Sequence, residues 1–248
     1  MQPTEASRIF QVEIRTRNLK RAVEFYQAVF DWKIQVVSMD YAMVDTGAAP
    51  LVALWQIPHI EFPVGVCNYI RVPDCAQAAA RVQQLGGRIC ISQTQLPGSG
   101  SFVGTLDPWG NEVFFWQSSS PGEPQFSGSA RNVMWWLEIP TTDINLAADY
   151  YRALLGWTFL TIVENKDVAF TNQGGLGRGI SLLSGEVGSQ VRGTTNYVTC
   201  SDLAALATRI TEAGGRVVRG PVTGIGGEGS FLIFRDRDEN RMGAFQPV

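Results

Sequence analysis

One pattern occurs twice in the sequence, first as Arg17-Asn-Leu-Lys-Arg-Ala-Val-Glu-Phe-Tyr-Gln-Ala-Val-Phe-Asp-Trp32 and again as Thr142-Asp-Ile-Asn-Leu-Ala-Ala-Asp-Tyr-Tyr-Arg-Ala-Leu-Leu-Gly-Trp157. In each copy a good N-cap residue, Asn18 or Asp143, precedes apolar residues spaced three and four positions apart. This spacing predicts an amphipathic helix that begins at the cap. A long repeat in fixed order predicts duplicated domains rather than a solenoid.

The correspondence continues toward the end of each copy. Asp74 matches Asp202, the pair Gly86-Gly87 matches Gly214-Gly215, and Asp107-Pro-Trp-Gly-Asn111 matches Asp236-Arg-Asp-Glu-Asn240. Residues 119–132 between the copies are rich in serine, proline and glycine, as a linker is. We therefore expect one domain over residues 8–118, a linker over 119–132 and a second domain over 133–247.

A smaller unit repeats inside each copy. An alternating strand precedes the first helix, and in copy one a second strand, Cys67–Val72, precedes a second helix, Ala76–Leu85. Three short strands are expected after each helix. The sequence thus predicts an α+β fold of four βαβββ modules, two in each domain.

Composition excludes several classes of protein. The chain has 248 residues, 45% hydrophobic and 17% charged, which is typical of a globular protein. A net charge of −3 without a basic run argues against a nucleic-acid partner. The apolar runs are too short to cross a membrane, and the N-terminus does not resemble a secretion signal. We expect a cytoplasmic protein with reduced cysteines.

The doubled βαβββ unit and its motifs resemble the vicinal-oxygen-chelate superfamily, which includes glyoxalases, bleomycin-resistance proteins and extradiol dioxygenases. The resemblance implies that paired modules curl their sheets into an open, barrel-like cleft that binds a small molecule. It also implies that catalytic members hold a divalent metal there with His, Glu or Gln side chains. The residues that carry it are Asn18, Ala22, Phe25, Tyr26 and Trp32, then Asp143, Ala147, Tyr150, Tyr151 and Trp157, with the Asp107–Asn111 motif.

The metal positions implied by the resemblance hold few donors. Four of them lie seven residues before each helix cap, and two lie three residues after the asparagine of the closing motif. These positions are Gln11, Cys67, Trp136 and Thr195, then Phe114 and Gly243. The single histidine, His59, lies in a connector, whereas a ring-cleaving iron site needs two histidines and a carboxylate. We therefore expect no family-type metal and no cofactor.

Strand alternation predicts which residues face each cleft. If Gln11 faces inward, Glu13 and Arg15 do too, while Phe10, Val12 and Ile14 pack under the helix. Glu13 and the equivalent Glu138 are candidate general bases. Alternatively, Glu13 pairs with Arg71 or Arg15, and Glu138 with Arg241, as structural ion pairs. The predicted ligand-binding residues are Gln11, Cys67, Tyr69, Arg71, Phe114, Trp116, Trp136, Thr195, Tyr197 and Arg241.

Three functions remain open from the sequence. The first is a metal-free protein that binds an aromatic or planar small molecule, as the family's bleomycin-resistance members do. The second is a metal-independent lyase, isomerase or hydrolase with a cleft glutamate as general base. The third is a divalent-metal, glyoxalase-like enzyme. A monomer or a homodimer is compatible with each. The glycine-rich segments 96–100 and 224–230 are expected to be hairpin turns rather than phosphate loops.

Overall fold

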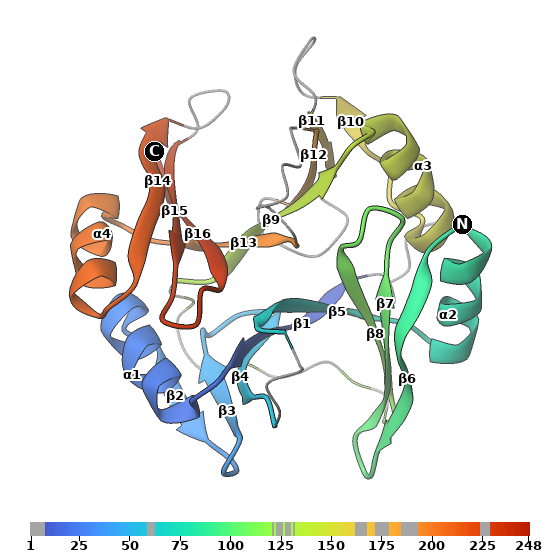
Figure 1. The fold of residues 1–248 in the computed structure, drawn as a ribbon, viewed down its shortest axis with the longest axis horizontal. Coiled ribbons are helices and arrows are strands. Elements are labelled where there is room, and N and C mark those ends of the chain that lie inside the picture. The colour runs from blue at the N-terminus through green and yellow to red at the C-terminus, as the bar shows by residue number, and fades with distance from the viewer. Residues whose placement is uncertain are drawn as a thin grey trace. The chain divides into compact units, whose positions relative to one another are not determined.

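The computed structural model describes residues 8–58, 63–120, 122, 126, 130, 132–161, 168–171, 179–184, 193–223 and 229–248. His59 and residues 224–228 lie outside these ranges. The described residues form four βαβββ modules in succession, as the sequence predicts (Figure 1). The α+β fold class is therefore confirmed.

The first two modules occupy the first half of the chain. Module one consists of β1 (Ile9–Thr16), α1 (Leu19–Phe30), β2 (Lys33–Val36), β3 (Tyr41–Asp45) and β4 (Leu51–Gln56). Module two consists of β5 (Gly65–Arg71), α2 (Cys75–Gln84), β6 (Arg88–Leu96), β7 (Gly100–Leu106) and β8 (Glu112–Ser118).

The other two modules repeat this order in the second half. Module three consists of β9 (Met134–Thr141), α3 (Ile144–Leu155), β10 (Leu160–Thr161), β11 (Val168–Thr171) and β12 (Gly179–Ser184). Module four consists of β13 (Thr195–Thr199), α4 (Leu203–Glu212), β14 (Arg216–Thr223), β15 (Gly229–Arg235) and β16 (Arg241–Pro247). None of the described helices is both long enough and apolar enough to span a bilayer.

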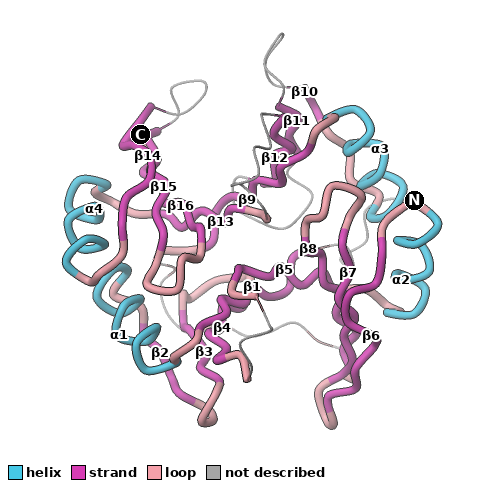
Figure 2. Tube along the Cα trace, in the orientation of Figure 1, coloured by secondary structure: helices cyan, strands magenta, loops and turns pink. Residues whose placement is uncertain are grey.

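The strands form two open eight-stranded sheets. Figure 2 distinguishes these strands, in magenta, from the helices, in cyan. Their orders are β2-β3-β4-β1-β5-β8-β7-β6 and β10-β11-β12-β9-β13-β16-β15-β14. In modules two, three and four the first strand pairs in parallel with the last, and the three strands after each helix pair antiparallel. The turn between Leu96 and Gly100 joins β6 to β7, so this glycine-rich segment is a hairpin as predicted.

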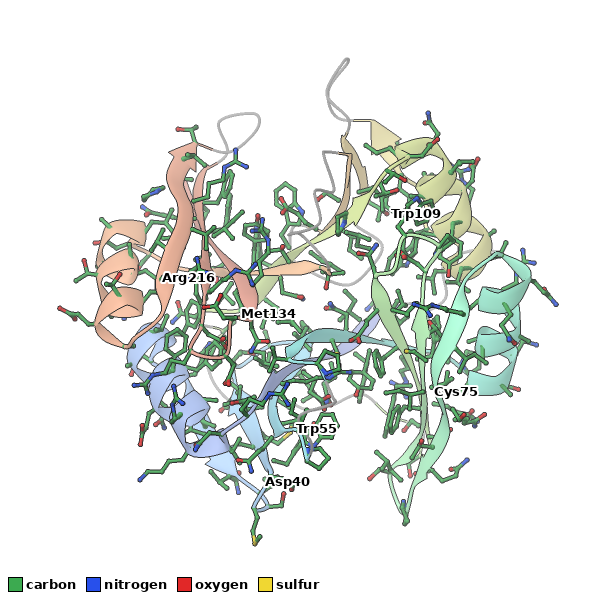
Figure 3. The ribbon with its side chains drawn as sticks, in the orientation of Figure 1. Asp40, Trp55, Cys75, Trp109, Met134 and Arg216 are labelled. Carbon is green, nitrogen blue, oxygen red and sulfur yellow. The ribbon has the colours of Figure 1, made fainter. Side chains whose placement is uncertain are left out.

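Each helix begins directly after its cap residue, and α2 therefore starts at Cys75, one residue earlier than predicted. The side chains of Asn18, Asp74, Asp143 and Asp202 each accept a hydrogen bond from the backbone N–H three residues later. These bonds satisfy amides that the helix itself leaves unpaired. Cys75, labelled in Figure 3, starts α2 and places its thiol 3.5 Å from the carbonyl oxygen of Phe115 on β8. The outer face of this sheet therefore packs against the helix.

The compact units of the structure combine modules from both halves of the sequence. One unit contains residues 12–66, 124–135 and 195–248, and in it α1 packs against α4. The other contains residues 1–11, 67–123 and 136–194, and in it α2 packs against α3. The predicted domain limits follow the repeat instead, and they remain a prediction.

The motifs of the repeat form the polar connections within these units. The hydroxyl of Tyr151 donates to Asp107 Oδ2 at 2.7 Å, and the hydroxyl of Tyr26 donates to Asp236 Oδ2 at 2.8 Å. All four residues are buried. Burial raises the pKa of Asp107 and of Asp236, although the hydrogen bonds they accept act in the opposite direction. The residues that carry the family resemblance therefore join module one to module four, and module three to module two.

Candidate functional site

The strands of module two align their inward-facing residues in rows. Tyr69 on β5 lies beside Phe114 on β8, and Arg71 lies beside Trp116. On the next strand, Phe102 lies opposite Trp116. Because side chains alternate along a strand, these residues share one face of the sheet, here called the aromatic face.

Close ring contacts hold the aromatic face together. Cys67, Tyr69 and Phe114 are buried, and the half-buried Phe102 and Trp116 pack against them. The Tyr69 ring centroid lies 5.0 Å from that of Phe114 and 6.1 Å from that of Phe102, which are favourable aromatic separations. The predicted residues Cys67 and Phe114 thus form the base of this face, and Phe102 and Trp116 are its accessible part.

Phe10 belongs to this assembly, which corrects the prediction that it packs under the helix. Its ring stacks on Trp116 with centroids 5.9 Å apart and planes 1° from parallel. The guanidinium of Arg71 lies 5.9 Å above the Phe10 ring. Phe10 lies near the start of β1, where its ring stacks on Trp116, whereas strand alternation alone suggested the opposite face.

Trp116 carries a polar group that the described residues do not satisfy. Its indole Nε1 is buried and has no hydrogen-bond acceptor among them. A buried N–H without an acceptor costs free energy, about 1–3 kcal/mol. The indole is therefore suited to donate a hydrogen bond to a bound molecule.

The thiol of Cys67 is turned toward a carboxylate. Its Sγ donates to Glu112 Oε2 at 3.1 Å, and Cys67 is 0% exposed. Strand alternation also places Glu112 on the same face as Phe114 and Trp116, but it does not pair this carboxylate with Cys67. The signal was their position at the start of two strands that pair in parallel, β5 and β8.

Module four has a different inner face. Arg241 Nε donates to Thr195 Oγ1 at 2.9 Å, so these two predicted residues meet. The ring of Tyr197 covers Gly243: a Cβ at that position would lie 2.2 Å from the ring carbon Cδ1. Phe231 packs against Tyr197 with centroids 6.0 Å apart, and the guanidinium of Arg219 lies over Phe231.

The remaining candidates lie in modules one and three. Trp136 Nε1 donates to Ser181 Oγ at 2.8 Å, and Glu138 lies beside Ser181 in the β9–β12 ladder. Glu13 is 5% exposed, whereas Glu138 and Gln11 are half-buried. These positions do not test the ion pairs or the general-base roles predicted for Glu13 and Glu138. Both alternatives remain predictions.

The residues at the implied metal positions do not fit a family-type metal. The Cys67 thiol donates to Glu112, the Trp136 indole has only a donor to offer, and the Tyr197 ring occupies the space beside Gly243. Such a site needs three or more converging oxygen, nitrogen or sulfur ligands. Over the ranges that the structure describes, no three His, Cys, Asp or Glu side chains converge in this way.

Comparison with known families agrees with the modular fold. The model of the Glyoxalase/Bleomycin resistance protein/Dioxygenase superfamily matches residues 134–243, and the model of the bleomycin resistance protein-like N-terminal region matches residues 8–47. The chain is similar to this superfamily through modules three and four and through the start of module one. The resemblance inferred from the sequence motifs is confirmed.

Two curated proteins match over nearly the whole chain. The proteins named "Putative glyoxylase CFP32" from Mycobacterium bovis and Mycobacterium tuberculosis are each 24% identical to it over 238 residues. Each alignment covers 91% of this chain and 89% of the relative.

Solved structures of dioxygenases share the fold. One is homoprotocatechuate 2,3-dioxygenase from Brevibacterium fuscum in an anaerobic complex with 3,4-dihydroxyphenylacetate, at a TM-score of 0.70 and 16% identity. It is matched over 100% of this chain and 84% of the other. A room-temperature structure of an extradiol ring-cleaving dioxygenase from B. fuscum gives a TM-score of 0.68 at 16% identity, covering 98% of this chain and 73% of the other.

Proposed function

We propose that this chain is a small-molecule-binding protein of the glyoxalase/bleomycin-resistance type, which binds an aromatic or planar ligand without a family-type metal. The observation that carries the proposal is how the implied metal positions are used. Three of these positions hold Cys67, Trp136 and Gly243. The Cys67 thiol pairs with a carboxylate, the Trp136 indole is hydrogen-bonded, and a tyrosine ring covers Gly243. Aromatic walls with a few polar groups are typical of pockets for small organic molecules.

The aromatic face of module two suits such a ligand best. Phe102 and Trp116 are its half-buried, accessible members, and they offer ring surface for stacking. The N–H of Trp116 lacks an acceptor among the described residues, so a ligand carbonyl or phenolate oxygen would satisfy it. The ligand is then an aromatic molecule with a hydrogen-bond acceptor on its ring or edge.

Isothermal titration with 3,4-dihydroxyphenylacetate and 2-naphthoate tests this assignment. Trp116→Phe keeps a stacking ring but removes the donor, so we expect it to weaken binding about two- to tenfold. Trp109→Phe is the matched control, because Trp109 packs edge-to-face on Tyr150 of α3 and lies outside the aromatic face (Figure 3). Equal affinity of the wild type and Trp116→Phe, or efficient turnover of a bound probe, would contradict the proposal.

Metal analysis tests the other half of the proposal. Protein purified without chelator is expected to contain far less than one equivalent of zinc, nickel, manganese or iron, because the described donors do not converge. One equivalent of any of these metals, lost together with activity on chelation, would favour the glyoxalase-like alternative. We further expect a cytoplasmic monomer or homodimer whose partner is a small molecule rather than nucleic acid.

A metal-independent enzyme is the second candidate. The position of Glu138 favours this candidate. Its half-buried carboxylate is on β9, the strand that also carries Trp136, and it lies beside Ser181 of the paired strand β12. A general base must reach the proton that it removes, and a partly accessible carboxylate meets this need. Glu138→Gln and Glu13→Gln should then abolish turnover of a substrate while the folded state is retained. Unchanged rates in both variants would eliminate this candidate.

A further inference from the structure

A cavity in the compact unit that contains α1 and α4 shares no residue with the aromatic face. Its volume is about 880 Å³, enough for a small organic molecule. The end of α1, the start of β2, the turn after β3 and the connection from β13 into α4 line it. None of the predicted ligand-binding residues takes part in its wall.

Arg209 of α4 supplies a cation that has no ion-pair partner in the part of the chain that the structure describes. Its Nε is buried and has no acceptor, and no carboxylate among the described residues lies within ion-pair distance of its guanidinium. The neighbouring Cys200 does not supply a negative charge either, because burial raises the pKa of its thiol to about 11. A guanidinium in this state is suited to a carboxylate, which can accept two parallel hydrogen bonds from it.

The C-terminal end of α1 brings negative charge to the wall of the cavity. Asp31 ends α1 in the left-handed conformation, at a φ of 54°, and α1 has no basic residue in its last turn. The helix C-terminus and the Asp31 carboxylate therefore both favour a cation. Asp45 lies directly opposite Lys33 in the β2–β3 ladder, so these two charges offset each other.

The remaining wall combines ring surface with hydroxyl groups. The rings of Phe30 and Trp32 stack with centroids 4.8 Å apart, and both side chains are buried. Thr199 Oγ1 accepts a hydrogen bond from Val133 N at 3.0 Å, which leaves its hydroxyl hydrogen available to a ligand. The cavity thus offers an anion site, a cation site and an apolar surface.

We propose that this cavity binds a small zwitterion of the amino-acid class. Its carboxylate is held by Arg209, its ammonium group by the Asp31 end of α1, and its side chain rests against the Phe30 and Trp32 wall. This site shares no residue with the aromatic face, so variants at Trp116 should leave it intact.

Isothermal titration with L-phenylalanine is the test, compared with L-phenylalaninamide, which lacks the carboxylate, and 3-phenylpropionate, which lacks the ammonium. We expect L-phenylalanine to bind and each analogue to bind at least about tenfold more weakly, since each loses a charge-assisted hydrogen bond. Arg209→Gln should weaken the binding of L-phenylalanine at least about tenfold. The difference in affinity between L-phenylalanine and L-phenylalaninamide should therefore become smaller. Asp31→Asn should reduce the difference in affinity between L-phenylalanine and 3-phenylpropionate. Asparagine tolerates the left-handed conformation at this helix end, so the fold should be retained.

Arg237→Gln is the matched control, because Arg237 is an arginine of the same unit that pairs with Glu24 at 3.9 Å outside the cavity. It should leave L-phenylalanine binding unchanged. Melting of each variant without ligand verifies its fold, and Arg209→Lys replaces Arg209→Gln if the latter unfolds. Absence of binding at millimolar L-phenylalanine, equal binding of 3-phenylpropionate, or equal losses in Arg209→Gln and Arg237→Gln would each overturn the proposal.

Discussion

Replacing Asp107 by asparagine is expected to lower the free energy of unfolding by about 2–4 kcal/mol. The carboxylate accepts four hydrogen bonds: Oδ1 from the backbone N–H groups of Trp109 and Asn111, and Oδ2 from the Asn111 amide and the Tyr151 hydroxyl. An asparagine has only one oxygen, so its own amide group would face two donors. Because Asp107 is buried, water cannot relieve the mismatch.

Chemical denaturation of Asp107→Asn and of Asp236→Asn measures this loss. Asp236 accepts the equivalent four bonds from Asp238, Asn240 and Tyr26, so the two losses should be similar. Asp74→Asn makes the same chemical change at an exposed helix cap, where asparagine performs as well as aspartate. A loss in Asp74→Asn as large as that in Asp107→Asn would contradict the explanation.

The pH dependence of Tyr151→Phe follows from the same carboxylate. Burial raises the pKa of Asp107, and the bond from Tyr151 opposes this rise. Removing the hydroxyl should therefore raise the pKa of Asp107 further. An aspartate whose folded-state pKa is raised stabilises the fold at low pH, and that contribution is lost as pH rises through the raised value. The destabilisation of Tyr151→Phe should thus be small near pH 4 and larger at neutral pH. A constant difference between wild type and variant across denaturation curves in this range would contradict it.

Gly243→Ala is expected to cost about 1–3 kcal/mol, the usual effect of overfilling a packed interior. The added methyl group would lie 2.2–2.6 Å from three carbons of the Tyr197 ring. Tyr197 is buried and packs against Phe231, so its ring has little room to move. The expected result is a lower midpoint of denaturation with no change in secondary structure.

A double-mutant cycle identifies the clash as the cause. Tyr197→Leu alone loses ring packing, but combined with Gly243→Ala it should recover part of the loss, which gives a favourable coupling energy. Gly110→Ala serves as the control, because a methyl group there would meet no described atom within 4 Å beyond its chain neighbours, and only the positive φ opposes the change. Simple additivity of Tyr197→Leu and Gly243→Ala would show that the ring is not the obstacle.

Local rules account for the parts of the fold that the sequence predicts well. The caps at Asn18, Asp74, Asp143 and Asp202 act over three residues, so periodicity and capping chemistry suffice to place the helices. The bond between Tyr26 and Asp236 joins residues far apart in the chain, and no local pattern predicts it.

The candidate site shows the same limit. Alternation correctly groups Tyr69 with Arg71 and Phe114 with Trp116, because these pairs lie on single strands. Alternation fails for Phe10, since it stacks on Trp116 of β8, which lies two strands away in the sheet. The cavity at Arg209 has no sequence signal at all, because its wall combines helix ends and turns from distant segments.

The pairing of α1 with α4 and of α2 with α3 decides how the protein can be divided. A cut in the linker would separate each helix from the helix it packs against, so neither fragment would retain a complete core. The two fragments would instead act as partners for each other, and their association would restore the buried bonds of Tyr26 and Tyr151. A chain divided in this way is the natural basis for a two-fragment complementation assay, in which recovery of the fold reports that the fragments have met.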